Sequence, residues 1–174
     1  MVPASLITFV SNHLSLKMEI TILAVGKTSE EFVINGVNEY LSRLKHYCKV
    51  NFIIIPENKH NAKLSTIQKK ERESLQILSA LPNHSCKVLL DEKGKELTSV
   101  DFSIFIQKQM NSGIKRLVFI IGGANGVAKN LKDKVDFILS LSTMTFTHQF
   151  IRVMLTEQVY RAYTILNNEL YHNE

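Results

Sequence analysis

Short runs of apolar residues recur along the chain and constrain its fold more than any other feature. The runs cover residues 20–25, 50–55, 87–90, 117–121 and 137–141. In several of them the apolar residues are continuous rather than alternating with polar ones, which is typical of strands covered on both faces of a parallel sheet. We therefore predict a mainly parallel sheet built from these runs.

Stretches with helical periodicity lie between the runs. Residues 29–47 place Phe32, Val33, Val37, Tyr40, Leu41 and Leu44 near one face, and residues 65–81 place Ile67, Leu75 and Leu78 on one side. A further helix opens with Thr98, and Asp101 three residues later makes a variant of the capping box. A last helix is expected from about residue 148 to 167. Strands that alternate with helices predict an α/β fold with helices on both faces of the sheet.

A chain of 174 residues favours a single domain. A strand begins at once in "MEITILAVGK", which starts at Met18, so we expect residues 1–17 to be an extension outside a domain of residues 18–174. This leading segment has no basic n-region and no clear cleavage site, so it makes a poor signal peptide. No apolar run in the sequence is long enough to span a membrane.

Two cysteines and a modest positive charge narrow the class of protein. Cys48 and Cys86 have no metal-ligand spacing and no C-x-x-C pattern. This favours reduced thiols in a cytoplasmic protein and implies no metal. Lys and Arg number 21 against 16 Asp and Glu. The excess fits an anionic partner such as nucleic acid, although many soluble proteins without such a partner carry as much.

The stretch "LVFIIGGANG", residues 117–126, ends a predicted strand in two adjacent glycines. In open α/β sheets ligands bind beyond the carboxyl ends of strands, which gives Gly122 and Gly123 a functional location. Their spacing matches neither a Walker A loop nor the dinucleotide-binding G-x-G-x-x-G, so phosphate binding is a weak interpretation. A tight turn in which glycine supplies a positive φ is the purely structural alternative.

The next loop, "SLSTMTFTHQFIR" at residues 140–152, leads into the last helix. We expect this helix to begin near Thr147, which places His148 and Arg152 one turn apart on one face. The chain ends in "YHNE", which contains Tyr171 and His172. Taken singly, such a histidine is usually an ordinary polar residue, and a terminal Tyr-His is usually a frayed end.

Together, these segments resemble a known family. The segments are "FIIGGANG", "LSTMTFTHQFIRVMLTEQVYRAYTI" and "YHNE", with "MEITILAVGK" at Met18 and "LLDEKGKELTS" at Leu89. They are similar to the RlmH family, small SPOUT-class methyltransferases of the bacterial large ribosomal subunit. The resemblance covers essentially all of residues 18–174. It implies an α/β knot, in which the C-terminal segment threads a loop and forms a deep trefoil.

The resemblance also implies a cofactor, a substrate and an assembly. The methyl donor is S-adenosylmethionine, and the substrate is a pseudouridine in helix 69 of 23S rRNA, methylated at N3. The enzyme acts as a homodimer, with each site near the partner chain. The matching cofactor positions are Leu90, Gly122, Gly123, Leu141, Ser142, Thr143, Met144, Thr145 and Phe146. The sequence departs from the family at Thr147, where proline is usual, and at Asn173, where arginine is frequent.

Methyl transfer from a sulfonium requires the donor and the acceptor to be held in near-attack geometry, and the acceptor nitrogen must lose a proton. His148 and His172 are candidates for the proton acceptor, because histidine titrates near neutral pH. We expect Arg152 to bind phosphate or to stabilise a developing anion. Tyr171 would stack on a base or donate a hydrogen bond. A structural alternative stays open for Arg152, namely an ion pair with Glu157 or with an acid of a partner chain.

The last helix is apolar on more than one face. Burial inside one chain is one explanation, and a dimer interface is the other, which we favour because so much of the circumference is apolar. The favoured function is an S-adenosylmethionine-dependent rRNA methyltransferase. One alternative is an RNA-binding module of the same fold that has lost catalysis, for which Asn173 is the best argument. Another is a nucleotide-phosphate enzyme of the doubly wound type.

Overall fold

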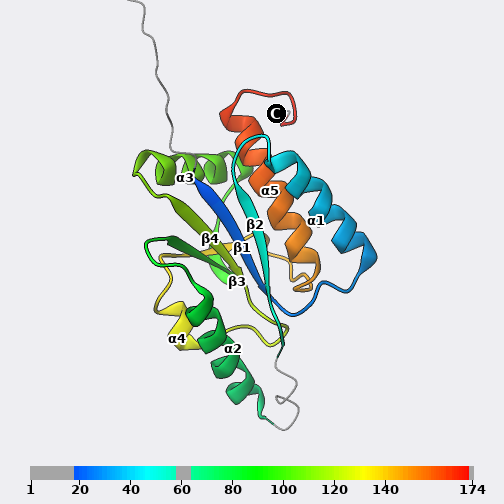
Figure 1. The fold of residues 1–174 in the computed structure, drawn as a ribbon, viewed down its shortest axis with the longest axis vertical. Helices are drawn as coiled ribbons and strands as arrows, with labels where there is room; N and C mark the ends of the chain where they lie inside the picture. Colours follow the sequence, from blue (N-terminus) through cyan, green and yellow to red (C-terminus); the bar gives the residue numbers. More distant parts are fainter. Residues whose placement is uncertain (1–17, 58–63, 173–174) are drawn as a thin grey trace, which may run out of the picture.

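The computed structural model describes residues 18–57 and 64–172, and it confirms the predicted parallel sheet (Figure 1). The strands are β1 (Glu19–Val25), β2 (Val50–Ile55), β3 (Cys86–Glu96), β4 (Arg116–Ile121) and β5 (Phe137–Ser140). They lie in the order β2-β1-β4-β3-β5, and every neighbouring pair is parallel. All the carboxyl ends therefore meet at one edge of the sheet. The predicted extension, residues 1–17, lies outside the described residues.

Helices cover both faces of the sheet, as predicted. They are α1 (Glu31–Leu44), α2 (Thr66–Ala80), α3 (Ser99–Asn111), α4 (Lys129–Lys132) and α5 (Phe150–Leu166). Figure 1 shows α1, α3 and α5 on one side of the strands and α2 and α4 on the other. Each layer has its own apolar core: Phe102, Leu155 and Val159 belong to the first, whereas Ile77 and Leu131 belong to the second.

The start of α3 confirms the predicted capping interaction. The Thr98 hydroxyl accepts a hydrogen bond from the Asp101 amide at 3.0 Å and donates one to the Asp101 carboxylate at 2.8 Å. These bonds satisfy a helix-terminal N–H that has no partner within the helix. The sequence pattern therefore located this helix start correctly.

The predicted apolar side of α2 is confirmed only at Leu78, which packs against the second core. Ile67 and Leu75 are 70% and 59% exposed, while Ser74 and Ile77 are fully buried. The reason is a contact that periodicity does not reveal: the Ser74 hydroxyl accepts a hydrogen bond at 2.9 Å from the backbone amide of Ala128, in the loop after β4. This bond turns the small, polar side of α2 toward the sheet and leaves two of its large apolar residues in solvent.

The apolar circumference of α5 is largely covered within the chain. The helix packs between α1 and α3, and Leu155 and Val159 are fully buried. Its contact with α1 is close, because a Cβ atom on Gly36 would lie 3.0 Å from Val153 Cγ1. The composition of α5 is thus explained by its neighbours and does not by itself require a dimer. No helix among the described residues is long and apolar enough to cross a membrane.

The edge strand β5 lies against an irregular part of β3. Leu139 pairs with Leu90 and again with Lys95, so β3 shifts register between these two residues. Within the shift, a Cβ atom on Gly94 would lie only 2.6 Å from the Leu139 carbonyl carbon and 2.7 Å from the Ser140 nitrogen. Because both of these are backbone atoms, glycine at position 94 is what allows the two strands to approach.

We predict that Gly94→Ala lowers the free energy of unfolding by about 3 kcal/mol, because β5 must move to admit the methyl group. The matched control is Gly113→Ala, at a residue with φ +75° and nothing within 4 Å of the added atom. There only the left-handed backbone conformation opposes the side chain, at about 1 kcal/mol. Urea unfolding of both variants measures the difference. Equal losses would mean that β5 gives way freely.

Candidate active site

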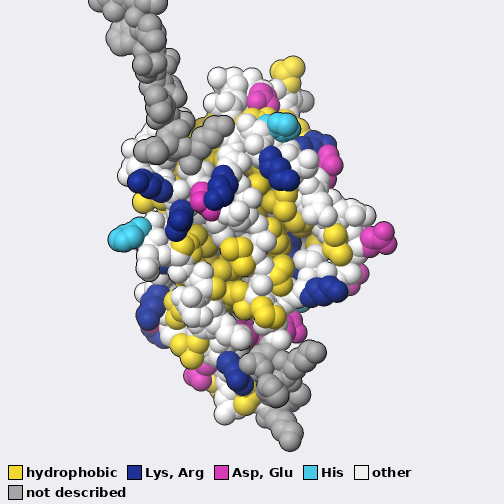
Figure 2. Space-filling model, in the orientation of Figure 1, with side chains coloured by type: hydrophobic (Ala, Val, Ile, Leu, Met, Phe, Trp, Pro, Cys, Tyr) yellow, Lys and Arg dark blue, Asp and Glu magenta, His cyan; other side chains and the backbone are white. Residues whose placement is uncertain are grey.

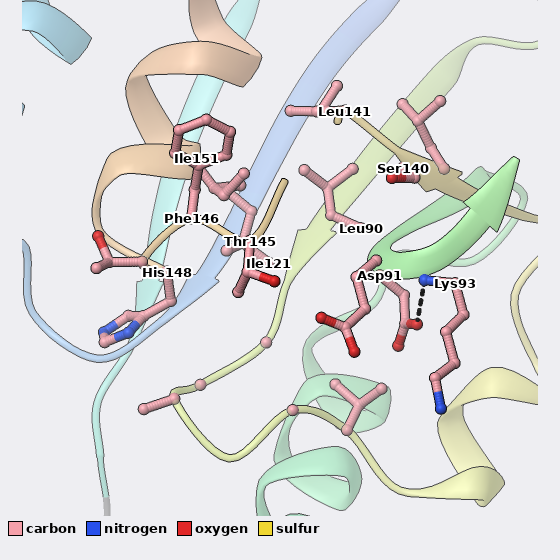
Figure 3. Close-up of a pocket in the computed structure, with 18 of the residues that line it drawn as sticks. Leu90, Asp91, Lys93, Ile121, Ser140, Leu141, Thr145, Phe146, His148 and Ile151 are labelled. Carbon is pink, nitrogen blue, oxygen red and sulfur yellow. Dashed lines mark hydrogen bonds between the residues drawn. The ribbon is translucent and has the colours of Figure 1, made fainter. Parts of the chain in front are cut away.

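A cavity of about 620 Å³ opens at the carboxyl ends of β3, β4 and β5 (Figure 3). Its wall comes mainly from three segments: residues 90–93, where β3 shifts register, and residues 121–127 and 139–148, at and beyond the ends of β4 and β5. The volume lies within the range of about 300–1,000 Å³ that is usual for sites of small ligands and cofactors. The location is the one expected for a ligand of a parallel α/β sheet.

The cavity brings together residues that the sequence places some fifty positions apart. Except for Thr143, which is exposed in the same loop, every predicted cofactor residue lines it: Leu90, Gly122, Gly123, Leu141, Ser142, Met144, Thr145 and Phe146. Figure 3 shows apolar side chains from each of the three segments, namely Leu90, Ile121, and Leu141 with Phe146. The site is thus a pocket of mixed character, in which these apolar side chains lie beside charged ones such as Asp91, Lys93 and Lys132.

The turn after β4 is built from glycines for reasons of space. A Cβ atom on Gly122 would lie 2.7 Å from Val127 Cγ1, and one on Gly123 would lie 2.6 Å from Glu73 Oε2. The left-handed backbone of the turn falls on Gly126, with φ +75°, whose amide donates to the Gly123 carbonyl at 2.9 Å. Side chains are therefore excluded where the backbone meets the cavity.

The loop between β5 and α5 is held by its own hydroxyl groups. Ser140 Oγ donates to the Ser142 carbonyl, and Ser142 Oγ accepts from the Met144 amide, both at 2.9 Å. Thr147 Oγ1 accepts from the Phe150 amide at 3.2 Å. The first turn of α5 therefore starts from Thr147, as expected, although regular helix begins at Phe150. These bonds leave the loop ordered against the cavity.

One charged pair in the cavity wall was missed by the sequence analysis. Asp91 directly follows the apolar run of β3, and its carboxylate lies 2.5 Å from Lys132 Nζ of α4. Burial acts to raise the pKa of Asp91, but the hydrogen bonds from Lys132 and the Lys93 backbone outweigh it and hold the pKa below its ordinary value. Its position after a strand was a usable signal, whereas nothing in the sequence marks Lys132.

His148 lies half-buried in the cavity lining, at the side nearest α5 (Figure 3). Burial lowers the pKa of its imidazole, the neighbouring Arg152 lowers it further, and Glu57 partly opposes them. The ring is therefore mainly neutral at neutral pH. A neutral imidazole can accept a proton, so His148 has the position and the protonation state of a general base.

Arg152 is fully buried, and its guanidinium points into the fold. It donates to the Val25 carbonyl at 2.8 Å, to Thr28 Oγ1 at 2.6 Å and to the His148 carbonyl at 3.3 Å. These bonds tie the end of β1 and the loop after it to the first turn of α5. The alternative of an ion pair with Glu157 is wrong, because Arg152 has these partners instead.

Glu157, in the middle of α5, pairs with Arg161 at 2.5 Å. Tyr171 and His172 lie in the same group: the Tyr171 hydroxyl donates to Glu157 at 3.2 Å, and His172 Nδ1 lies 3.3 Å from an Arg161 nitrogen. A single chain thus places His148 in the lining of the cavity and buries Arg152 away from it. Tyr171 and His172 lie beside the middle and second half of α5, outside this lining.

The fold and the site define the class of protein. The family of predicted SPOUT methyltransferases matches residues 18–172, and the chain belongs to this family. Within residues 18–57 and 64–172, no group of three or more His, Cys, Asp and Glu side chains is arranged to hold a metal ion.

Curated relatives make the similarity more particular. The chain is 46% identical over 157 residues to the ribosomal RNA large subunit methyltransferase H of Porphyromonas gingivalis and 48% identical over 157 residues to that of Phocaeicola vulgatus. Each alignment covers 90% of this chain and 100% of the relative.

Solved structures show the same fold at low sequence identity. A probable methyltransferase from Bordetella pertussis superposes with a TM-score of 0.53 at 8% identity, over 86% of this chain and 96% of that one. A probable methylase family protein from Haemophilus influenzae has a TM-score of 0.50 at 8% identity, over 91% and 72% of the two chains. At such identity the likeness concerns the fold alone.

We predict that Arg152→Met lowers the free energy of unfolding by about 3 kcal/mol, because it keeps the apolar stem but leaves the buried Val25 carbonyl without its donor. The control, Arg161→Met, removes a partly exposed ion pair and should cost less than about 1 kcal/mol. Chemical denaturation followed by circular dichroism measures both. A loss for Arg152→Met no greater than that of the control would contradict a structural tie at this residue.

Proposed function

We propose that the chain is a cytoplasmic, S-adenosylmethionine-dependent methyltransferase that modifies N3 of a pseudouridine in helix 69 of 23S rRNA on the ribosome. The observation that carries the proposal is the convergence of the glycine turn, the loop of residues 141–146 and His148 around one cavity. The names of the curated relatives, which are ribosomal RNA large subunit methyltransferases, support the substrate class.

The residues of the cavity fit this cofactor. Leu90, Leu141 and Phe146 offer apolar surface to an adenine ring, and backbone groups of the 141–146 loop would hydrogen bond its edge. The side-chain-free turn at Gly122 and Gly123 lets a bulky ligand approach the backbone. When bound, the cofactor supplies an electrophilic methyl group on a positively charged sulfur.

The chain's own contribution to the chemistry is positioning and proton transfer. With the cofactor bound, N3 of the uracil ring would gain the methyl group as the bond from sulfur to that methyl breaks, and the electron pair of that bond would stay on sulfur. The N3 proton passes to a ring nitrogen of His148, whose lowered pKa keeps it unprotonated beforehand. Arg152 acts as a positioning residue, because its bonds to Thr28 and to the start of α5 fix the backbone that carries His148.

A homodimer would complete the site. Within one chain Tyr171 and His172 pack beside Glu157 and Arg161 and do not line the cavity, so a second copy is the simplest source of such a pair beside His148. Figure 2 shows apolar side chains gathered on the face of the molecule that carries β2 and α1. Exposed residues of these elements are Phe32, Ile34, Ile53 and Ile54. An apolar surface of this kind fits a contact between protein chains.

The second candidate is an RNA-binding module that has lost catalysis. The sequence argument for it rests on Asn173, which lies outside the described residues. The cavity supports the enzyme, because a deep pocket at the strand ends, with apolar side chains on part of its wall and a neutral histidine in its lining, fits a small cofactor better than an extended phosphate backbone. Methyl transfer to ribosomes that lack the modification separates the two candidates.

We expect the purified protein to transfer labelled methyl groups to 23S rRNA in such ribosomes, with the rate falling only at acid pH. This direction of the pH dependence follows from His148. The pKa of its imidazole is lowered, so the neutral base is present at neutral pH and is lost when the pH falls through that pKa. His148→Gln should reduce the rate about 10²-fold or more and remove the acid limb. Ribosome binding without any transfer by the wild-type protein would favour the binding module.

Complementation between subunits tests the shared site. We expect a variant lacking residues 170–174 and the variant His148→Gln each to be inactive alone, and a mixture refolded together to regain activity. Mixed dimers would hold one site with an intact His148 and an intact tail from the other subunit. The control mixes the His148→Gln variant with Arg152→Met, whose defects fall on the same side of the site. Full activity of the tail deletion alone would show that the terminal residues are dispensable.

A further inference from the structure

A buried carboxyl group lies directly beneath the glycine turn, and the proposed chemistry does not use it. Glu73 of α2 is only 7% exposed. Its Oε2 occupies the space that a side chain on Gly123 would need, 2.6 Å from the Cβ position, and among the described residues it has no hydrogen-bond partner. Since Gly123 also lines the cavity, one layer of backbone separates this oxygen from the ligand space.

The charges around Glu73 leave it poorly compensated. Glu57, after β2, faces it and carries the same sign, whereas Lys69 on its own helix opposes. The nearby lysines of α4 are engaged elsewhere, because Lys129 pairs with Asp133 and Lys132 with Asp91. Val25, Gly26 and the glycine turn carry no charge.

An ionised carboxylate that is buried without a partner is costly, and burial together with Glu57 raises the pKa of Glu73. A cation bound on the other side of the turn would relieve this cost. Lys70 is the cation nearest the turn on the cavity side, with its Nζ 4.0 Å from the Cβ position of Gly126. It lies at the opposite end of the turn from Gly123, and its positive charge opposes a cationic ligand, so a preference for the cation must come from a carboxylate.

We propose that Glu73 is a specificity-determining residue that makes the cavity prefer the cationic methyl donor over its neutral product. The inference rests on the proposed function, in which the ligand is S-adenosylmethionine. Transfer of the methyl group converts the positively charged sulfonium into an uncharged thioether, S-adenosylhomocysteine. The two molecules otherwise have the same polar groups, so a negative charge beneath Gly123 favours the donor and promotes release of the product.

The neighbouring residue on α2 explains why Glu73 is more than a support for the turn. Ser74 performs that task, because its hydroxyl accepts a hydrogen bond at 2.9 Å from the Ala128 amide. A supporting glutamate would direct both carboxylate oxygens at donors, yet Oε2 of Glu73 faces the Cα of a glycine. The helix α2 thus supports the turn with the hydrogen bond of Ser74 and, separately, places the carboxylate of Glu73 beneath it.

Calorimetric titration of the full chain with S-adenosylmethionine and with S-adenosylhomocysteine tests the proposal. Glu73→Gln should weaken binding of the donor about tenfold, from the loss of one charge at short range in a partly buried site, and leave product binding unchanged within about twofold. Glu71→Gln, at an exposed position of the same helix, should change neither. Ser74→Ala should weaken both ligands equally, because it loosens the turn without altering charge.

The pH dependence gives a second readout. Because the ionised carboxylate attracts the cation, the ratio of the two affinities should rise with pH through the pKa of Glu73 and then level off. The series should stay below the range, about pH 7.7–8.0, in which the ligand's α-amino group titrates. His148 titrates in both proteins, so the difference between wild type and Glu73→Gln isolates Glu73. The ratio in the variant should be flat.

The titrations distinguish failure of the role of Glu73 from failure of the proposed cofactor. Parallel loss of both ligands in Glu73→Gln, or no loss of either, overturns the role of Glu73. Failure of the wild-type chain to bind either ligand would instead overturn the proposed cofactor. If Glu73→Gln does not fold, Glu73→Asp keeps the charge but shortens its reach. That variant should then show a reduced preference for the donor with unchanged affinity for the product, and an unreduced preference would overturn the proposal.

Discussion

The buried guanidinium of Arg152 is the interaction on which the arrangement of the site depends. A parallel sheet delivers its strand ends to one edge, but it does not fix the loops that leave them. Arg152 joins the end of β1, through Val25, to the loop at Thr28 and to the first turn of α5. Because the 141–149 loop ends at that turn, this one side chain also sets where the loop meets the cavity. Its burial is costly, and its three acceptors offset that cost.

The fold could be predicted well because its main signal is local. Continuous apolar runs identify strands covered on both faces, and all of them were found. The burial of Leu75 in α2 was predicted incorrectly, because the orientation of this helix depends on a contact distant in sequence. Ser74 hydrogen bonds to the Ala128 amide and is buried, so Leu75, the next residue, faces solvent. The threading of the chain through a knot stays a prediction, since apolar periodicity carries no information about the path of a loop.

The backbone of the candidate site could be predicted from the sequence better than its side chains. Glycines at a strand end have a general physical meaning, so Gly122 and Gly123 could be located without any structure. The direction in which a side chain points could not be predicted from the sequence. Arg152 was expected to meet RNA or to pair with Glu157, but it points inward, because the unpaired carbonyl at the end of β1 needs a donor. Glu73 gave no signal at all, since a glutamate within a charged helix usually lies in solvent.

In the structure, the apolar surface of α5 is no longer evidence for a dimer. The apolar circumference of this helix is covered by α1, α3 and the sheet, so it no longer requires a second chain. The proposed dimer rests instead on the place of the chain end. Tyr171 and His172 pack beside Glu157 and Arg161, in the middle and second half of α5, and do not line the cavity that contains His148. One chain does not bring these residues to the cavity, but two copies can place the chain end of one beside the start of α5 in the other.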